Sequence, residues 1–233
     1  MREVVIVSGA RTAIGDYLGT LKDVPAVDLG VIAVRGALDK AGIEAKDVED
    51  IVGGMIYKAG AKGNPARQVQ LKAGIPETAA AVTVDQQCGS AMRALEIASQ
   101  QIMLGKADIS VAFGIESMSQ APYLLLKARE GYRMGHGSIE DSMLHDGLIC
   151  AMMNYHMGIT AENLAEQYGI PREEQDELAF LSHQRAVKAI AEGKFKDEIV
   201  PVEVIKNKKT FIFDTDEHPR ADVTLEGLGK LRP

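Results

Sequence analysis

Short apolar runs alternate with helical patterns along the first half of the chain. The run Val4–Val7 is apolar on both faces, as a buried parallel strand is. Runs of this kind predict four strands, at 4–7, 51–57, 79–84 and 108–114. The intervening segments predict three helices, at 26–41, 65–72 and 89–104. Alternating strands and helices of these lengths predict an α/β fold with right-handed crossovers.

Local signals support the helix boundaries. Gly42 follows the first helix, and Pro65 and Gly74 start and stop the second. The segment 89–104 carries Ala, Met, Leu or Ile on nearly every side and few charges. A helix that is apolar all round is buried, so we expect burial for this one.

The pattern changes after Ser119. Gly, Met and His become dense between residues 131 and 157, without a clear period. Amphipathic helices follow at 161–168 and 172–192, and short strands at 199–204 and 210–213 flank a charged turn at 206–209. We therefore predict two domains, at 1–118 and 119–233.

Composition excludes several classes of protein. The net charge is −7 and there is no Trp, which disfavours nucleic acid as a partner. No apolar stretch approaches the ~18 residues that span a bilayer, so we expect a soluble, cytoplasmic protein without a membrane partner. The two cysteines, Cys88 and Cys150, do not suggest a disulfide, and the five histidines lack paired ligand spacing. We expect no metal site.

Cys88 is the residue with the clearest potential for chemistry. A strand ends before it, a tight turn follows, and a helix begins at the cysteine. The N–H groups and the positive dipole end of that helix favour the nucleophilic thiolate. Ligands of α/β sheets bind at such carboxyl edges. A buried structural cysteine is the alternative, because free cysteines are commonly buried. The residues alone leave both interpretations open.

Recognisable motifs occur in order across nearly the whole chain, at Arg11–Asp16, Leu21–Leu29, Asn64–Gln68, Gln87–Ala94, Gly114–Tyr123, His145–Leu148, Tyr155–Asn163, Phe195–Pro201 and Leu231–Pro233. Together they resemble the thiolases, and within them the acetyl-CoA acetyltransferase branch. The resemblance implies a mixed, mostly parallel five-stranded type of sheet with helices on both faces. Residues 1–118 would form this core, and 119–233 an inserted α+β loop domain over the coenzyme A site.

The resemblance also assigns roles to residues. Cys88 would take the acetyl group of acetyl-CoA as a thioester, which a second acetyl-CoA attacks to give acetoacetyl-CoA; thiolysis is the reverse. Coenzyme A thioesters are then substrates, and no cofactor is expected. His156 and Met157 would line the pantetheine tunnel, and Leu148 and Arg220 would contact the nucleotide end of coenzyme A. For Arg220 a solvated surface charge remains an alternative.

Three positions depart from the family pattern. Asp85 stands where the family usually has Asn, and an ionised carboxylate beside Cys88 would oppose formation of the thiolate. Ala91 replaces a Gly in the nucleophile helix, where the added methyl group would crowd the packing. Ala13 replaces a Pro, and we expect little effect from that change.

The family's Asn-Glu-Ala-Phe, Gly-His-Pro and Cys-x-Gly-Gly-Gly motifs do not occur in this sequence. The resemblance therefore implies that the C-terminal half of the enzyme and the last strand of the N-terminal sheet are absent. The apolar face of the 89–104 helix and a sheet edge would then be exposed. We expect the chain to form a homo-oligomer or to bind a complementary C-terminal thiolase chain.

Three functions compete. The first is a thiolase part that is active only with its other half. The second is a coenzyme A-binding or scaffold fragment without turnover of its own, which Asp85 and the absent half favour. The third is a ketoacyl synthase, which shares the fold and the cysteine, but the Glu116 and His156 motifs argue against it.

Overall fold

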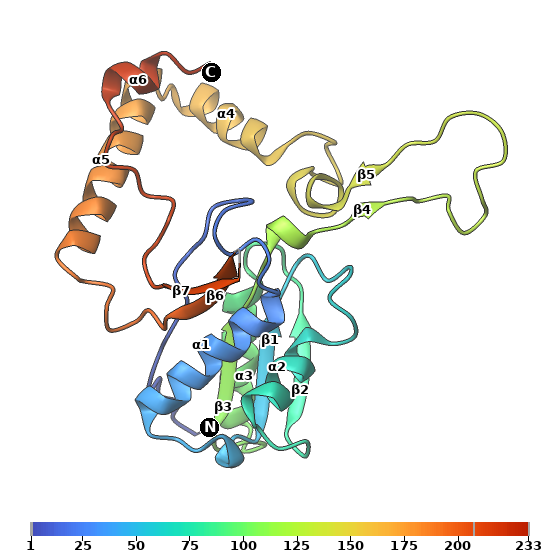
Figure 1. The fold of residues 1–233 in the computed structure, drawn as a ribbon, viewed down its shortest axis with the longest axis vertical. Helices are drawn as coiled ribbons and strands as arrows, with labels where there is room; N and C mark the ends of the chain where they lie inside the picture. Colours follow the sequence, from blue (N-terminus) through green and yellow to red (C-terminus); the bar gives the residue numbers. More distant parts are fainter. Residues whose placement is uncertain (1, 207, 233) are drawn as a thin grey trace.

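A three-stranded parallel sheet forms the core of the first half of the chain, in the lower part of Figure 1. The structure is a computed structural model that describes residues 2–206 and 208–232. The strands are β1 (Asp50–Gly54), β2 (Ala80–Val84) and β3 (Ser110–Gly114), in the order β2-β1-β3, and both pairings are parallel. The α/β class and the parallel sheet predicted from the sequence are confirmed.

Helices cover both faces of this sheet. On one face lie α1 (Ala26–Ala41) and α2 (Pro65–Ala73), and on the other lies α3 (Ser90–Met103). The alternation of side chains along a strand explains the division. Ile51 is buried in the cluster with α1 and α2, whereas Val52 is buried against α3. The apolar run of β1 thus fills two cores at once.

The predicted strand at Val4–Val7 is wrong. The segment lies outside the sheet, and Val5, Ile6 and Val7 are 68%, 76% and 66% exposed. A groove of about 280 Å³ separates residues 3–8 from β3, with α1 and α3 forming its other walls. A strand needs a neighbouring backbone to satisfy its N–H and C=O groups, and β3 lies across this groove. An apolar run alone does not supply that partner.

The predicted burial of the 89–104 helix is confirmed for one face only. Ala94 and Ala98 are buried against the sheet, whereas Met92 is 76% exposed and Leu104 is 67% exposed. An even distribution of apolar residues therefore does not place this helix in the interior. The exposed apolar face agrees with the expectation drawn from the thiolase resemblance.

The second half of the chain contains helices, two short hairpins and loops. Its elements are β4 (Tyr123–Leu124), β5 (Glu140–Asp141), η3 (Leu144–Leu148), α4 (Met157–Tyr168), α5 (Arg172–Ala191), β6 (Val202–Lys206), β7 (Lys209–Phe213) and α6 (Leu225–Gly229). The last strands and the two long helices were predicted, but the short elements were not. The predicted turn at 206–209 includes Asn207, and the last motif includes Pro233; both lie outside the described residues. Short single turns, at Ala45–Asp47 (η1) and Met118–Gln120 (η2), complete the chain.

The β6–β7 hairpin packs against the start of the chain. Val202, Val204 and Phe213 form a buried cluster with Ala13 and Leu21. Ala13, the residue that departs from the family pattern, is 1% exposed within this cluster. The predicted domains are thus joined by a shared core, and the boundary near residue 118 stays a prediction.

Arg11 fastens the same two segments together through charge. Its Nη1 and Nη2 donate to the two carboxylate oxygens of Asp216 at 2.7 and 2.9 Å. Its Nε donates to Glu198 at 2.7 Å, and the guanidinium lies 5.3 Å from the centre of the Phe195 ring. Two-pronged pairs of this kind are stronger than ordinary surface ion pairs.

In the part of the chain that the structure describes, no helix combines the length and apolar character needed to cross a membrane.

We predict that Asp216→Asn lowers the free energy of unfolding by about 1.5–3 kcal/mol at neutral pH, as expected for a lost charged hydrogen bond. The hydrogen bond from Arg11 outweighs burial and lowers the pKa of Asp216 below its ordinary value of 3.8. This contribution is present above pH 3.8 and is lost as the pH falls through the lower folded value. Urea unfolding at several pH values measures it.

The exposed Asp222 provides the control, as Asp222→Asn. Equal losses of stability in the two variants would contradict a specific role for the Arg11–Asp216 pair.

Candidate active site

The turn between β2 and α3, residues 85–89, carries Cys88 and is here named the Cys88 elbow. Two backbone bonds close it, from Gly89 N to Gln86 O at 3.1 Å and from Ser90 N to Gln87 O at 3.0 Å. Cys88 is exposed, whereas Cys150 is only partly so. The structure therefore places Cys88 at the carboxyl edge of the sheet, and a buried structural cysteine is the wrong interpretation.

Backbone strain marks this elbow. Gln87 has a φ of +50°, in the left-handed region that residues with a side chain rarely adopt. Ser90 holds the conformation, because its Oγ accepts from Gln86 N at 2.8 Å and donates to Gln87 O at 2.6 Å. The turn is thus kept in place by bonds on both sides of the strained residue.

Two glycines at strand ends allow α3 to approach the sheet closely. A Cβ atom on Gly54 would lie 2.5 Å from the carbonyl carbon of Ser90. One on Gly114 would lie 2.6 Å from the Cβ of Ala91. The methyl group of Ala91, expected to crowd this region, is accommodated because Gly114 has no side chain.

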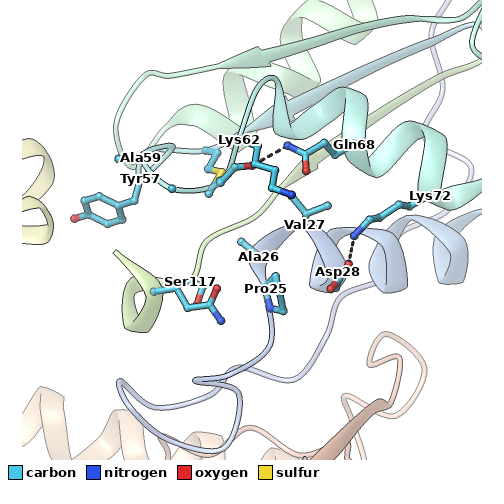
Figure 2. Close-up of a pocket in the computed structure, with 14 residues that line it drawn as sticks. Pro25, Ala26, Val27, Asp28, Tyr57, Ala59, Lys62, Gln68, Lys72 and Ser117 are labelled. Atoms are coloured by element: carbon cyan, nitrogen blue, oxygen red, sulfur yellow. Dashed lines mark hydrogen bonds and ion pairs between the residues drawn. The ribbon is translucent and has the colours of Figure 1, made fainter. Parts of the chain in front are cut away.

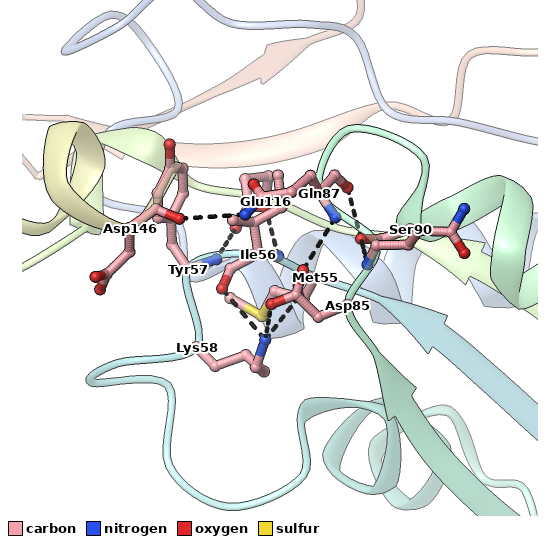
Figure 3. A network of polar contacts seen from close by, with 10 residues as sticks. Met55, Ile56, Tyr57, Lys58, Asp85, Gln87, Ser90, Glu116 and Asp146 are labelled. Atoms are coloured by element: carbon pink, nitrogen blue, oxygen red, sulfur yellow. Dashed lines mark hydrogen bonds and ion pairs between the residues drawn. The ribbon is translucent and has the colours of Figure 1, made fainter. Parts of the chain in front are cut away.

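Lys58 balances the charge of Asp85 (Figure 3). Its Nζ lies 2.7 Å from Asp85 Oδ2, and Asp85 Oδ1 accepts from Gln87 N at 3.0 Å. Burial raises the pKa of Asp85. The hydrogen bonds from Lys58 and Gln87 N together have a larger effect in the opposite direction, so the pKa lies below its ordinary value. Asp85, the first residue of the elbow, is therefore ionised, as expected from the sequence, but Lys58 is paired with it. Sequence analysis missed Lys58, because no local pattern links it to Asp85.

Glu116 supports the segment that carries Lys58. Its carboxylate accepts from Ile56 N at 2.9 Å and from Tyr57 N at 3.2 Å. Burial raises the pKa of Glu116 above its ordinary value of 4.5, although these two hydrogen bonds oppose the shift. Glu116 was recognised from the sequence only as part of a motif, and the structure shows that it orients the loop after β1.

The helix η3 lies against this group of residues. Tyr57 donates its hydroxyl to Met143 O at 3.0 Å, and Gln87 Nε2 donates to Asp146 O at 3.4 Å. Burial raises the pKa of Tyr57, with Glu116 and Cys88 adding to the shift. Contacts from both sides therefore hold η3 next to the Cys88 elbow.

Three of the predicted coenzyme A residues lie together at η3. Leu148 ends this helix, and the next residue, Ile149, pairs with His156 across a short turn. His156 caps α4, since its Nδ1 accepts from Gly158 N at 3.0 Å. Met157 begins α4 and is 38% exposed. The turn thus gathers Leu148, His156 and Met157 beside η3; their roles stay predictions.

Arg220 lies in a different part of the molecule. Its backbone N donates to His183 of α5 at 3.1 Å. A small cavity next to it, of about 230 Å³, is lined by residues 222–231 around α6. In Figure 1 this region is at the far end of α4 from η3. The structure therefore does not bring Arg220 together with the other predicted residues.

A separate cavity of about 310 Å³ lies between the start of α1 and the loop after β1 (Figure 2). Tyr57, Lys62, Gln68 and Ser117 are among its lining residues, and Cys88 is not. Lys72 pairs with Asp28 at 2.6 Å on its rim. This cavity adjoins the loop that carries Lys58 without forming part of the cysteine site.

Comparison with known proteins gives consistent matches. Residues 4–233 match the model of "Thiolase, N-terminal domain". The chain is 50% identical over its whole length to an acetyl-CoA acetyltransferase of Escherichia coli and 48% identical to one of Pseudomonas aeruginosa. The solved acetyl-CoA acetyltransferase of Syntrophomonas wolfei is 51% identical, with a TM-score of 0.94 over 98% of this chain and 57% of that one. The chain spans 59% and 60% of the length of the two curated relatives.

We predict that Gly54→Ala destabilises the protein by about 1–3 kcal/mol, the usual cost of forcing extra volume into a packed site. The new Cβ meets backbone atoms of Ser90, so the start of α3 must shift. Chemical denaturation measures the loss of stability, and the rate of maleimide labelling of Cys88 reports the shift of the elbow.

Gly63→Ala is the matched control, because a Cβ at Gly63 meets no atom within 4 Å. If Gly54→Ala changes neither the stability nor the labelling rate, the close approach of β1 to α3 does not determine the position of the Cys88 elbow.

Proposed function

The chain belongs to the thiolase family, and on that basis we propose that Cys88 accepts the acyl group of a coenzyme A thioester. The observation that carries the proposal is the exposed thiol of Cys88 on a strained strand-to-helix turn. Such a turn leaves the sulfur accessible at the start of a helix, where the dipole favours a thiolate. The three names among the relatives reported above, all acetyl-CoA acetyltransferase, make acetyl-CoA the proposed substrate.

The proposed reaction begins with attack of the Cys88 thiolate on the carbonyl carbon of acetyl-CoA. The carbon–sulfur bond to coenzyme A breaks, the coenzyme A thiolate leaves, and an acetyl thioester remains on Cys88. A second acetyl-CoA, deprotonated at its α-carbon, then attacks this thioester to give acetoacetyl-CoA and free Cys88. Thiolysis runs in the opposite direction.

Condensation needs a base for the α-carbon proton. In the thiolase pattern this base belongs to the Cys-x-Gly-Gly-Gly motif, and Cys150 lacks that glycine-rich context. We propose that the chain by itself takes an acetyl group onto Cys88 but does not turn over. A cytoplasmic location is part of the same proposal.

For coenzyme A binding we propose that His156 and Met157 line the approach of the pantetheine arm to Cys88, and that Leu148 contacts the nucleotide end. The contact of Gln87 with Asp146 supports this, because it holds η3 beside the Cys88 elbow. Arg220 is proposed to meet the nucleotide end. Arg220 N donates to His183 of α5, so the proposal puts the nucleotide end near α5.

We propose further that a complementary C-terminal thiolase polypeptide covers the exposed face of α3 and the groove beside β3. Met92 and Leu95 of α3 are 76% and 46% exposed, and unpaired sheet edges tend to recruit other chains.

Mixing the chain with acetyl-CoA is predicted to add one acetyl group to Cys88. Intact-mass spectrometry detects the adduct, and digestion locates it. Cys88→Ala should remove the adduct and Cys150→Ala should retain it, because only Cys88 lies on the elbow. No adduct on Cys88 would disprove acyl transfer to this residue and favour a non-catalytic coenzyme A-binding protein.

Association with a C-terminal thiolase polypeptide is predicted to weaken in Leu95→Glu, because a charge in an apolar interface is costly. The separately produced C-terminal region of the Escherichia coli relative serves as the partner, and analytical ultracentrifugation gives the mass. Exposed Lys194→Glu is the control. A chain that remains a 25.1 kDa monomer in the presence of this partner would contradict the proposal. A homo-oligomer would also contradict it and would show that a second copy of the chain covers this face.

A further inference from the structure

The Cys88 elbow, which is the loop after β2, meets the loops that follow β1 and β3. The loop after β1 contributes Lys58, the loop after β2 contributes Asp85, and the residue Glu116 follows β3. Lys58 Nζ lies within hydrogen-bond reach of Asp85 Oδ2 at 2.7 Å, Met55 O at 3.2 Å and Ile56 O at 3.4 Å. The ammonium group of one lysine therefore connects two of these loops.

Asp85 links Lys58 to the strained residue Gln87. Its Oδ2 faces Lys58, and its Oδ1 accepts from the backbone N–H of Gln87 at 3.0 Å. Gln87 has a φ of +50° and directly precedes Cys88. A left-handed residue that is not glycine persists only where its surroundings hold it. The carboxylate of Asp85 is one of the groups that hold it.

The charges around the elbow are mostly negative. The titratable groups of this region that influence one another are Tyr57, Lys58, Asp85, Cys88, Glu116, Asp141 and Asp146. Lys58 is the cation in that set. On α3, Arg93 is paired with Glu96 at 2.6 Å, and on η3 the ring of His145 lies 2.7 Å from Asp146. Lys58 thus offsets the negative charge of Asp85, the carboxylate within the elbow.

We propose that Lys58 and Asp85 act as one positioning pair for Cys88 in the acyl transfer proposed above. Asp85 holds the turn through Gln87 N, and Lys58 cancels the charge that Asp85 brings to a site where a thiolate must form. The Asn usual in the family could accept the same backbone hydrogen bond without a charge. The Asp of this chain requires a cation, and Lys58 supplies it.

The test measures the rate of alkylation of Cys88 by iodoacetamide against pH, in the full chain with Cys150→Ser as background. Lys58→Met leaves the charge of Asp85 uncompensated. We expect the pH midpoint of Cys88 alkylation to rise by about half a unit to one unit, which is the lower part of the range of pKa shifts caused by a nearby, partly exposed charge. Asp85→Asn should lower the midpoint, since it removes a negative charge.

The double variant Lys58→Met/Asp85→Asn separates pairing from simple structural damage. It removes both charges together, so its midpoint should return close to that of the background chain. Lys58→Arg should also retain that midpoint. Lys62→Met, at an exposed lysine of the same loop, is the control. Circular dichroism confirms that each variant is folded.

Midpoints that are the same in Lys58→Met and the background chain would overturn the pair. So would a double variant whose midpoint stays as high as that of Lys58→Met, because Lys58 would then act through something other than the charge of Asp85. Alkylation requires no coenzyme A, so the acetylation assay is run in parallel. Shifted midpoints without acetylation of Cys88 would support the pair and refute the proposed function; acetylation with unshifted midpoints would do the reverse.

Discussion

The parallel pairing of β1 with β2 and β3 is the constraint on which the rest of the structure depends. Parallel strands end at the same edge of a sheet, so the loops that follow them are brought together wherever they lie in the sequence. The Cys88 elbow, the loop with Lys58 and the residue Glu116 meet for this reason. The glycines at the strand ends then let α3 approach closely enough to hold the elbow.

The second half of the chain depends on the first for its position. The Arg11–Asp216 pair and the cluster around Val202 and Phe213 fasten β6 and β7 to the first residues. Tyr57 and Gln87 do the same for η3. In contrast, α4 and α5 bury no residue fully. The second half is therefore attached to the first at these two places, and the exposed helices α4 and α5 lie between them (Figure 1).

Prediction from the sequence succeeded where a local signal was sufficient. The bounds of α1 and α2 follow from an apolar stripe together with Pro65, Gly42 and Gly74, all of which act within a few residues. It failed where the outcome required a distant partner. Val4–Val7 has the composition of a strand, but β3 lies across a groove from it. The same holds for α3. Its apolar residues are able to pack on every side, but only those that face the sheet have a neighbouring element that buries them.

By itself, the sequence determined the α/β class, the family, and the position of Cys88 between a strand and a helix, because ordered motifs and short-range periodicity carry that information. It also exposed Asp85 as a departure from the pattern. Only the tertiary structure decided what Asp85 does, since Lys58 is 27 residues away and reaches it through the pairing of β1 with β2. The grouping of Leu148 with His156, and the separate place of Arg220, have the same origin: contacts between distant segments are made by packing.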